Sequence, residues 1–358
     1  MMFVRVARAV FALAFALCGC VSSRIERAVS DAVAGPVAEQ RFAGVVLVAR
    51  DGRPLFLEAY GLADREQRIA HTPDMRFMIM SVSKQFTAVL IMRLAAAGAL
   101  RLDDPVSRYL DHWPAEWNGV EIRHLLSHSS GLPIDATYFW LVQHHPEYWA
   151  DPSSAPPPYQ PAPLLAPPGT KYQYANIGYT LLSRIAAGAG GRPFDELIRD
   201  EVLRPLGLRH TQPERGSRVP GRARGYTRTA QGLILSEQKT IDIVGAGDLV
   251  STAGDLARFD AAFDGDGFLP AALRQAMLAP HVRSTRDSLG YGWFLRTTGG
   301  GHALQYHAGD GAGFRAFNYR LPNERLAVVI LCNIGEHDMP WIAPLVDRIA
   351  DVVAQGAR

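Results

Sequence analysis

The sequence predicts an α+β fold, in which one antiparallel sheet is flanked by helices, is assembled from both ends of the chain and carries a mainly helical subdomain. Apolar residues alternate with a period of two after residue 40 and again near the C-terminus, whereas the middle of the chain has a helical period. The chain of 358 residues is 48% hydrophobic and 20% charged, so it can bury a large core. We expect one domain over about 25–355, with an α/β part over about 25–80 and 245–355 and a helical insertion over about 81–244.

Residues 1–19 have the pattern of an export signal. Arg5 and Arg8 precede an apolar run, Ala9–Leu17, that is too short to span a bilayer. The stretch LCGC that follows resembles a bacterial lipoprotein processing box, which implies cleavage before Cys20 and lipidation of its thiol. We therefore expect an exported lipoprotein that faces the periplasm of a bacterial envelope and meets the membrane through Cys20. The alternative is an ordinary secretory signal, in which Cys20 has no special role.

Charge and cysteine content exclude two classes of protein. The formal net charge is +2 and no basic run is present, so the footprint of a nucleic-acid-binding protein is missing. Of the 3 cysteines, Cys18 belongs to the signal and Cys20 to the lipidation site. Cys332 then stands alone in the apolar run AVVILCN, where it reads as a small buried hydrophobic residue. A disulfide framework is excluded.

The strands of the predicted sheet come as two hairpins. VVLVAR and PLFLEAYG flank Asp51-Gly52, which is a strong turn signal. FRAFNYR and RLAVVILCN flank LPNE near the C-terminus. Pro340 then opens a last helix with apolar residues on one face: Ile342, Leu345, Val346, Ile349 and Val353. Between the hairpins, nine prolines over 146–168 exclude a regular element and predict a surface loop at the rim of the site.

The first candidate for chemistry is Ser81, followed one helical turn later by Lys84. The chain has 34 arginines and only 3 lysines, so the choice of Lys at 84 calls for a reason. Lys can lose its proton when it is buried, whereas Arg cannot, and an amine beside a hydroxyl can activate it as a nucleophile. An apolar stretch, FMIM, enters this motif and an amphipathic helix leaves it. The alternative is a helix cap with a solvent lysine, and we interpret a second copy of the spacing, Ser236 and Lys239, as coincidence.

Two further motifs follow in order: Tyr174-Ala175-Asn176, and His307-Ala308-Gly309 before Asp310. With Ser81 and Lys84 they make the chain resemble the serine β-lactamase and penicillin-binding peptidase superfamily. It looks most like the branch of class C β-lactamases, D-Ala-D-Ala carboxypeptidases and esterases of the same fold. Further matching stretches are IRHLLSHSSGLP, LRPLGLRHT, GAGDLVSTAGDLARF and YGWF. The resemblance covers about residues 25–355 and implies a β-lactamase/transpeptidase-like fold.

The resemblance also implies a division of labour. Ser81 would be the acylated nucleophile, and Lys84 and Tyr174 would form a proton-transfer pair, with the Tyr oxygen held near its ionised form. Asn176 would hydrogen-bond the substrate and Lys84. The backbone N–H groups of Ser81 and Asp310 would form the oxyanion hole. His307 would line the opposite wall, and Gly309 would let the substrate approach the edge of the strand.

Two departures from the family pattern bear on the substrate. The β-lactamases usually carry Lys where this chain has His307, which is weakly charged at neutral pH. Asp310 adds a negative charge that should repel an anionic acyl compound. Both features favour an esterase or a peptidase over an efficient β-lactamase. A wall position without a proton role is the alternative for His307, and a buried Tyr and a turn Asn are the alternatives for Tyr174 and Asn176.

We therefore expect a serine hydrolase that acts through an acyl-enzyme on a small-molecule or peptide substrate, as a monomer and without metal or organic cofactor. The rival hypothesis is a non-catalytic envelope protein that uses the same fold to bind peptides or cell-wall fragments. His124 and His128 are spaced i, i+4, but no HExxH glutamate lies between them, so a loop-stabilising role is expected. The chain has no G-x-S-x-G, so the α/β-hydrolase route to a serine enzyme has no support.

Overall fold

The computed structural model describes residues 21–144, 158–215, 217–236, 243–265, 267–311, 313–335 and 339–356. The predicted signal and Cys20 lie outside these residues, as does Lys239 of the second Ser-Lys spacing; Ser236 ends a short strand. None of the helices in the described ranges has both the length and the apolar character that crossing a membrane requires.

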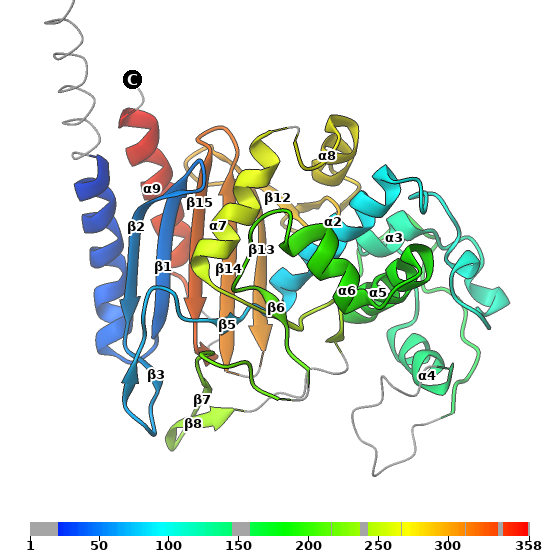
Figure 1. Cartoon of the computed structure of the whole chain (residues 1–358), viewed down its shortest axis with the longest axis horizontal. Coiled ribbons are helices and arrows are strands. Elements are labelled where there is room, and N and C mark those ends of the chain that lie inside the picture. The colour runs from blue at the N-terminus through cyan, green and yellow to red at the C-terminus, as the bar shows by residue number, and fades with distance from the viewer. Residues whose placement is uncertain are drawn as a thin grey trace, which may run out of the picture.

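An antiparallel sheet of eight strands forms the centre of the molecule (Figure 1). Its order is β10-β11-β12-β13-β14-β15-β1-β2, so the first strands of the chain pair with the last. This confirms the prediction of an α+β fold with a sheet built from both ends. The strands are β1 (Gly44–Arg50), β2 (Arg53–Tyr60), β10 (Val282–Arg283), β11 (Ser288–Leu289), β12 (Phe294–Thr297), β13 (Ala303–Gly311), β14 (Phe314–Leu321) and β15 (Leu326–Cys332).

Both predicted hairpins are confirmed. Strands β1 and β2 close on the pair Arg50 and Arg53, and Asp51 and Gly52 between them both have positive φ, at 54° and 71°. Two positive φ values in a two-residue loop match the right-handed twist of the flanking strands. Strands β14 and β15 are likewise antiparallel, and β15 is buried along its whole length, including Cys332. The solitary cysteine is therefore the small hydrophobic residue that its sequence context predicted.

Helices cover both faces of the sheet (Figure 1). The helix over residues 21–38 and α9 (Ile342–Gly356) pack on one face, against alternate residues such as Val46 and Val48. The predicted apolar face of α9 is buried, which confirms the last helix. Helices α2 (Ser83–Ala96) and α7 (Ala253–Ala261) pack on the other face, against Val45 and Leu47. The candidate site lies on this second face.

Helix α2 differs from the amphipathic helix that its sequence predicted. Every residue from Ser83 to Met92 is buried, because α2 lies between the sheet and helix α5 (Asn176–Gly190). Polar residues of α2 therefore face protein groups and need partners there. Gly98, with φ of 73°, follows the helix as the predicted stop.

The predicted insertion over 81–244 contains helices and short strands, and its boundaries stay a prediction. Besides α2 and α5 it holds α3 (Ile122–Leu126), α4 (Ile134–His144), α6 (Phe194–Ile198), β6 (Gln212–Pro213), β7 (Gly225–Thr229) and β8 (Gly232–Ser236). Two of these strands pair outside the range: β7 with β16 (Ile334–Gly335), and β6 with β9 (Leu249–Ser251), which also pairs with β5 (Phe77–Met78). Strand β8 pairs with β7 inside the range. The short pair β3 (Leu62–Asp64) and β4 (Ile69–Ala70) and helix α8 (Ala271–Leu278) complete the fold. The described part of the proline-rich stretch, 158–168, has no regular element, as expected.

Candidate active site

Ser81 lies in a single 3-10 turn, η1 (Met80–Val82), that leads directly into α2. Met80 has φ of 49°, a left-handed conformation that costs energy for a residue with a side chain and that is often found at functional sites. Ser81 is partly exposed, whereas Lys84, one turn later, is completely buried. The predicted pair is thus a hydroxyl that a substrate can reach, with an amine beneath it.

The Lys84 amine has three polar neighbours. Its Nζ lies 3.1 Å from Ser81 Oγ, 2.8 Å from Asn176 Oδ1 and 2.7 Å from the Ala246 carbonyl oxygen. The two carbonyl oxygens only accept hydrogen bonds, so a neutral amine spends its two N–H groups on them and turns its lone pair to the serine hydroxyl. Burial lowers the pKa of Lys84 well below its usual range, while the charge of Asp248 partly opposes the shift. This shift favours the neutral amine, which is the form that a general base needs.

Tyr174 and Asn176 join this pair at the start of α5. The Tyr174 hydroxyl hydrogen-bonds with Ser81, and Lys84 Nζ lies 4.9 Å from the centre of the Tyr174 ring. Burial raises the pKa of Tyr174, and the hydrogen bond with Ser81 offsets this only in part. The net shift favours the protonated phenol, which runs against the expectation of a Tyr oxygen near its ionised form. The proton-transfer roles of Tyr174 and Lys84 stay predictions.

His307 lies on β13 and is buried. Its Nδ1 is 2.7 Å from the Ala308 carbonyl oxygen, which can only accept, so Nδ1 carries the proton. Its Nε2 is buried without a hydrogen-bond partner among the described residues. Burial, followed by the nearby Lys84, lowers the pKa of His307 to about 3. The residue that stands where the β-lactamases usually carry a lysine is therefore uncharged at neutral pH.

Gly309 is required by packing, before any substrate is considered. A Cβ built on Gly309 would lie 2.2 Å from the Ile79 carbonyl oxygen and 2.9 Å from Met80 Cβ. Strand β13 thus packs with its backbone directly against the backbone that carries Ser81. Only a residue without a side chain permits this approach. The two segments named for the oxyanion hole are neighbours for this reason.

Asp310 corrects one expectation. Side chains alternate along a strand, so Asp310 shares the face of Ala308, which packs on the α9 side, and not the face of His307 and Gly309. Its carboxylate lies 3.3 Å from Arg315 Nη1, on the residue directly opposite in β14. The charge that was expected to repel an anionic acyl compound is therefore paired with a cation and turned away from the Ser81 face. The role of the Asp310 N–H stays a prediction.

Several residues around the amine were not foreseen as parts of the site. His128 packs its ring 4.4 Å from that of Tyr174, and its Nδ1 accepts the Ala175 N–H at 3.3 Å. Tyr179 lies with its ring centre 5.7 Å from Lys84 Nζ. His124 lies in α3, where its Nδ1 accepts the Glu121 N–H at 3.1 Å and caps the start of the helix, whereas a loop-stabilising role was expected. Ala246 lies in GAGDLVSTAGDLARF, which the sequence analysis named only as a stretch that matches the family.

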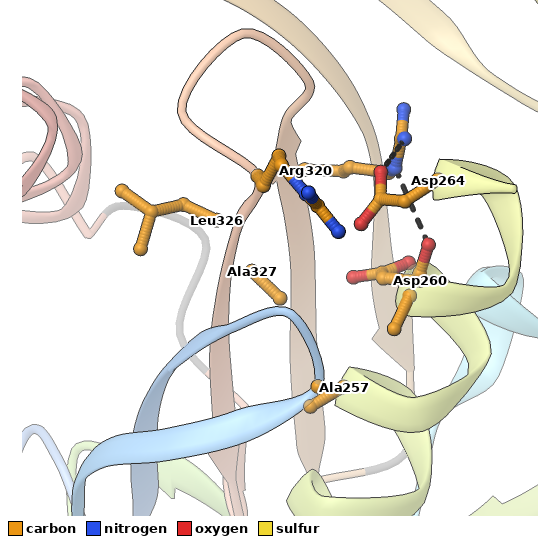
Figure 2. Close-up of a pocket in the computed structure, with 9 residues that line it drawn as sticks. Ala257, Asp260, Asp264, Arg320, Leu326 and Ala327 are labelled. Carbon is orange, nitrogen blue, oxygen red and sulfur yellow. Dashed lines mark hydrogen bonds and ion pairs between the residues drawn. The ribbon is translucent and has the colours of Figure 1, made fainter.

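A hollow elsewhere on the molecule is separate from this cluster. It lies between Gly52 of the first hairpin turn, the end of α7 and strands β14 and β15, and Figure 2 shows Asp260, Asp264 and Arg320 around it. None of the residues that line it belongs to the Ser81 cluster. No group of His, Cys, Asp and Glu side chains in the described part of the chain is arranged to hold a metal ion.

The geometry around Ser81 defines a class of protein. A reachable hydroxyl, a buried amine of lowered pKa beneath it and a phenol beside it are the parts that nucleophilic acyl transfer needs. Together with the sheet and helices around them, they define a serine hydrolase.

Comparison with known proteins agrees and gives the family. The model of the Beta-lactamase family matches residues 27–347, so the chain belongs to the Beta-lactamase family. A penicillin-binding protein of Bacillus subtilis (strain 168) is 27% identical, over 83% of this chain and 69% of its own length. The D-alanyl-D-alanine-carboxypeptidase/endopeptidase AmpH of Escherichia coli (strain K12) is 24% identical, over 87% and 84%. The solved structure of EstCE1, a hydrolase with promiscuous acyltransferase activity, has a TM-score of 0.74 at 24% identity and covers 93% of this chain and 99% of that one, which confirms the fold.

Proposed function

We propose that this protein hydrolyses esters or amides through an acyl-enzyme on Ser81. The observation that carries the proposal is the 3.1 Å contact between Lys84 Nζ and Ser81 Oγ, in a site whose burial lowers the pKa of the amine. Ser81 Oγ attacks the carbonyl carbon of the substrate while its proton passes to Lys84. The leaving alkoxide or amine takes up that proton, and Tyr174, hydrogen-bonded to Ser81, can relay it.

Water completes the cycle by attacking the acyl-enzyme, which frees the acid and restores Ser81. The carbonyl oxygen becomes negative in both steps, and two backbone N–H groups, those of Ser81 and Asp310, would stabilise it. The close approach of Gly309 to the Ile79 carbonyl supports this pairing, because it brings β13 against η1. Asn176 would orient the substrate, and the chain's own groups suffice for each step.

The first experiment tests whether the protein is catalytic. The chain is incubated with a fluorophosphonate and, separately, with a penicillin, and its mass is measured. We expect a stoichiometric adduct on Ser81 that is lost in Ser81→Ala. A folded protein that forms no adduct with several such probes would instead favour the rival hypothesis of a non-catalytic module that binds peptides or cell-wall fragments.

Among the acyl compounds, we propose that uncharged esters are turned over most readily. The neutral His307 supports this preference, since it offers no cation to a substrate carboxylate. The pairing of Asp310 with Arg315 removes the second reason for this preference, which now depends on His307 alone. A side-by-side assay with a chromogenic cephalosporin, a short-chain p-nitrophenyl ester and a D-Ala-D-Ala peptide tests it. Faster cleavage of the cephalosporin contradicts the preference.

We propose further that Cys20 anchors the protein to a membrane of the bacterial envelope, on its periplasmic side, and that the anchored protein is a monomer. The LCGC box supports the anchor, and Cys20 itself lies outside the described residues. A Cys20→Ser variant should leave the membrane fraction on cell lysis. Retention in that fraction contradicts the anchor, and light scattering in detergent measures the oligomeric state.

A further inference from the structure

One short segment of backbone is held against α2 by three side chains of that helix. Ser83 Oγ accepts the Leu249 N–H at 3.1 Å, Lys84 Nζ donates to the Ala246 carbonyl at 2.7 Å, and Thr87 Oγ1 donates to the Gly245 carbonyl at 2.6 Å. We name residues 245–249 the amine-binding loop. Its position decides where the Ala246 carbonyl lies and hence how the Lys84 amine is oriented.

The loop is closed on itself by Asp248, whose side chain is completely buried. Asp248 Oδ1 accepts the Gly245 N–H at 2.9 Å, which ties the two ends of the turn together. Gly245, with φ of 74°, lets the backbone turn there, and a Cβ on it would lie 2.9 Å from Ser183 Cβ. Asp248 therefore shapes the turn that presents the Ala246 carbonyl.

The same carboxylate is anchored from outside the loop. Its Oδ2 lies 2.7 Å from Arg215 Nη2, and that guanidinium nitrogen also lies 2.7 Å from Asp195 Oδ1. The backbone carbonyl of Asp248 also accepts the N–H of Glu214, the residue before Arg215, at 2.9 Å. A buried carboxylate needs such a partner, since isolation would neutralise it. Burial raises the pKa of Asp248, and the nearby Arg215 guanidinium opposes this rise, which favours the charged carboxylate beneath the site.

We infer that Asp248 is a positioning residue for Lys84, which it orients through the Ala246 carbonyl and whose charge state it sets through its own buried negative charge. The inference rests on the proposed function only in giving Lys84 the role of base. Asp248 contacts no reacting atom. It acts through the position of the amine-binding loop and through the electrostatic field of its carboxylate at the Lys84 amine.

The other groups that face the amine are neutral in the resting protein. Ser81 comes from η1, Tyr174 and Asn176 from the start of α5, and Tyr179 from its second turn. The neighbouring imidazoles have pKa values lowered by burial and, next, by Lys84 itself: those of His128 and His307. Asp248 is the charge that counters the desolvation of Lys84, and it raises the pKa that burial lowers. Arg215 screens this charge without touching the amine.

Two substitutions remove the charge and keep an acceptor for the Gly245 N–H: Asp248→Asn and Asp248→Ser. The composition makes a direct measurement practical, because the chain has only 3 lysines. Lysine labelled with 13C at Cε is incorporated, and the three signals are titrated, with that of Lys84 assigned through the exposed Lys171→Arg variant and a Lys239→Arg variant. We expect the Lys84 transition to move to lower pH by about one unit in whichever Asp248 variant folds.

Asp195→Asn is the matched control. Like Asp248, Asp195 has a carboxylate oxygen 2.7 Å from Arg215 Nη2, and this substitution removes its charge. Asp195 is partly exposed, however, and lies outside the amine-binding loop. We expect the Lys84 transition of this variant to coincide with that of the wild type. An unchanged Lys84 transition in a folded Asp248 variant, or an equal shift in Asp195→Asn, overturns the inference.

A second readout connects the inference to catalysis. The rate of Ser81 acylation by a p-nitrophenyl ester is measured from pH 5 to 10, and its rising limb should move with the Lys84 transition, to lower pH in Asp248→Asn. A merely structural role would lower the rate at every pH without moving the limb. Absence of acylation in the wild type would refute the proposed function, whereas the NMR titration would still decide whether Asp248 sets the charge of Lys84.

Discussion

At the scale of the residue, function depends on an amine that can exist without its charge. Lys84 is buried, and its polar contacts are Ser81, Asn176 and the Ala246 carbonyl. An arginine at this position would stay protonated and could not take the serine proton. We predict that Lys84→Arg forms the fluorophosphonate adduct on Ser81 at least about 100-fold more slowly than the wild type. Lys171→Arg, at an exposed lysine, is the control for the substitution itself, and circular dichroism checks the fold.

If the Lys84→Arg variant is acylated at the wild-type rate, another group removes the proton of the Ser81 hydroxyl. Tyr174 is the group to examine in that event, because its hydroxyl hydrogen-bonds with Ser81.

Much of the candidate site could be predicted at this scale, and the failures share one cause. Ser81 and Lys84 follow from residue chemistry, and Tyr174, Asn176 and His307 follow from the resemblance. The protonation of Tyr174 could not be predicted, because it depends on burial, which no local pattern encodes. The face that Asp310 occupies depends on strand register. Asp248 was overlooked because its contacts with Gly245 and Arg215 exist only in the folded chain.

At the scale of the element, catalysis depends on the backbone contact between β13 and η1. An alanine at Gly309 would place Cβ 2.2 Å from the Ile79 carbonyl oxygen, so one of the two segments must move. We predict that Gly309→Ala lowers the free energy of unfolding by about 1–3 kcal/mol and reduces acylation of Ser81 by tenfold or more. Chemical denaturation and the adduct assay measure the two effects.

Gly254→Ala makes the same change where space is available. A Cβ on Gly254, in the first turn of α7, meets only Thr252 Oγ1 at 4.0 Å. Because alanine favours a helix over glycine, this variant should be as stable as the wild type or more stable, with unchanged acylation. Equal behaviour of the two variants would contradict the role assigned to Gly309.

The elements that the sequence predicted best are those whose pattern is local. The hairpins at Asp51-Gly52 and at LPNE, and the apolar face of α9, need no knowledge of distant residues. Strand β7 was missed although it forms a local hairpin with β8; only its parallel partner, β16, lies more than a hundred residues later in the chain. The burial of α2 on all sides was missed because α5, which covers its outer face, is distant in the sequence.

At the scale of the whole molecule, a buried polar network makes stability depend on pH. Asn318 Nδ2 donates to Asp260 Oδ1 at 2.9 Å and to Gln85 Oε1 at 3.0 Å, which joins β14 to α7 and to α2. Burial raises the pKa of Asp260 to about 7, against the opposing effects of Asn318 and Arg320. The folded protein therefore holds this proton more tightly than the unfolded chain. Its stability should fall as the pH rises from about 4, the unfolded pKa, to about 7.

We predict that Asp260→Asn removes this part of the pH dependence. The amide keeps an oxygen for the Asn318 donor and cannot ionise, so the variant should become more stable relative to the wild type as the pH rises through the window. Urea denaturation at pH 4.5, 6 and 7.5 measures the difference. Asp31→Asn, at an exposed carboxylate near Arg348, should show no such trend. A constant difference between Asp260→Asn and the wild type contradicts a proton on Asp260.

A second pH-dependent contact, that of His302 with Glu324 and Asp351, joins three separate segments of the chain. His302 Nδ1 lies 2.7 Å from Glu324 Oε1 and Nε2 lies 3.0 Å from Asp351 Oδ1, so one imidazole bridges the turn before β13, the turn before β15 and helix α9. Burial lowers the pKa of His302, but the hydrogen bonds to Glu324 and Asp351 outweigh it, and the net pKa is raised. The charged imidazole therefore stabilises the fold fully below about pH 6.5, and this contribution is lost as the pH rises through the folded pKa.

The sign of this effect can be tested by comparison with His281, whose pKa is shifted in the opposite direction. The pKa of His281 is lowered, by burial above all, so the fold disfavours its charged form and loses stability as acid protonates it. We predict that the stability lost in His302→Gln is greatest near pH 6 and shrinks towards pH 8.5. The effect of His281→Gln should change with pH in the opposite direction, since the wild-type residue is at its least favourable near pH 6. Parallel pH trends in the two variants, measured by urea denaturation, would show that the carboxylates do not hold a proton on His302.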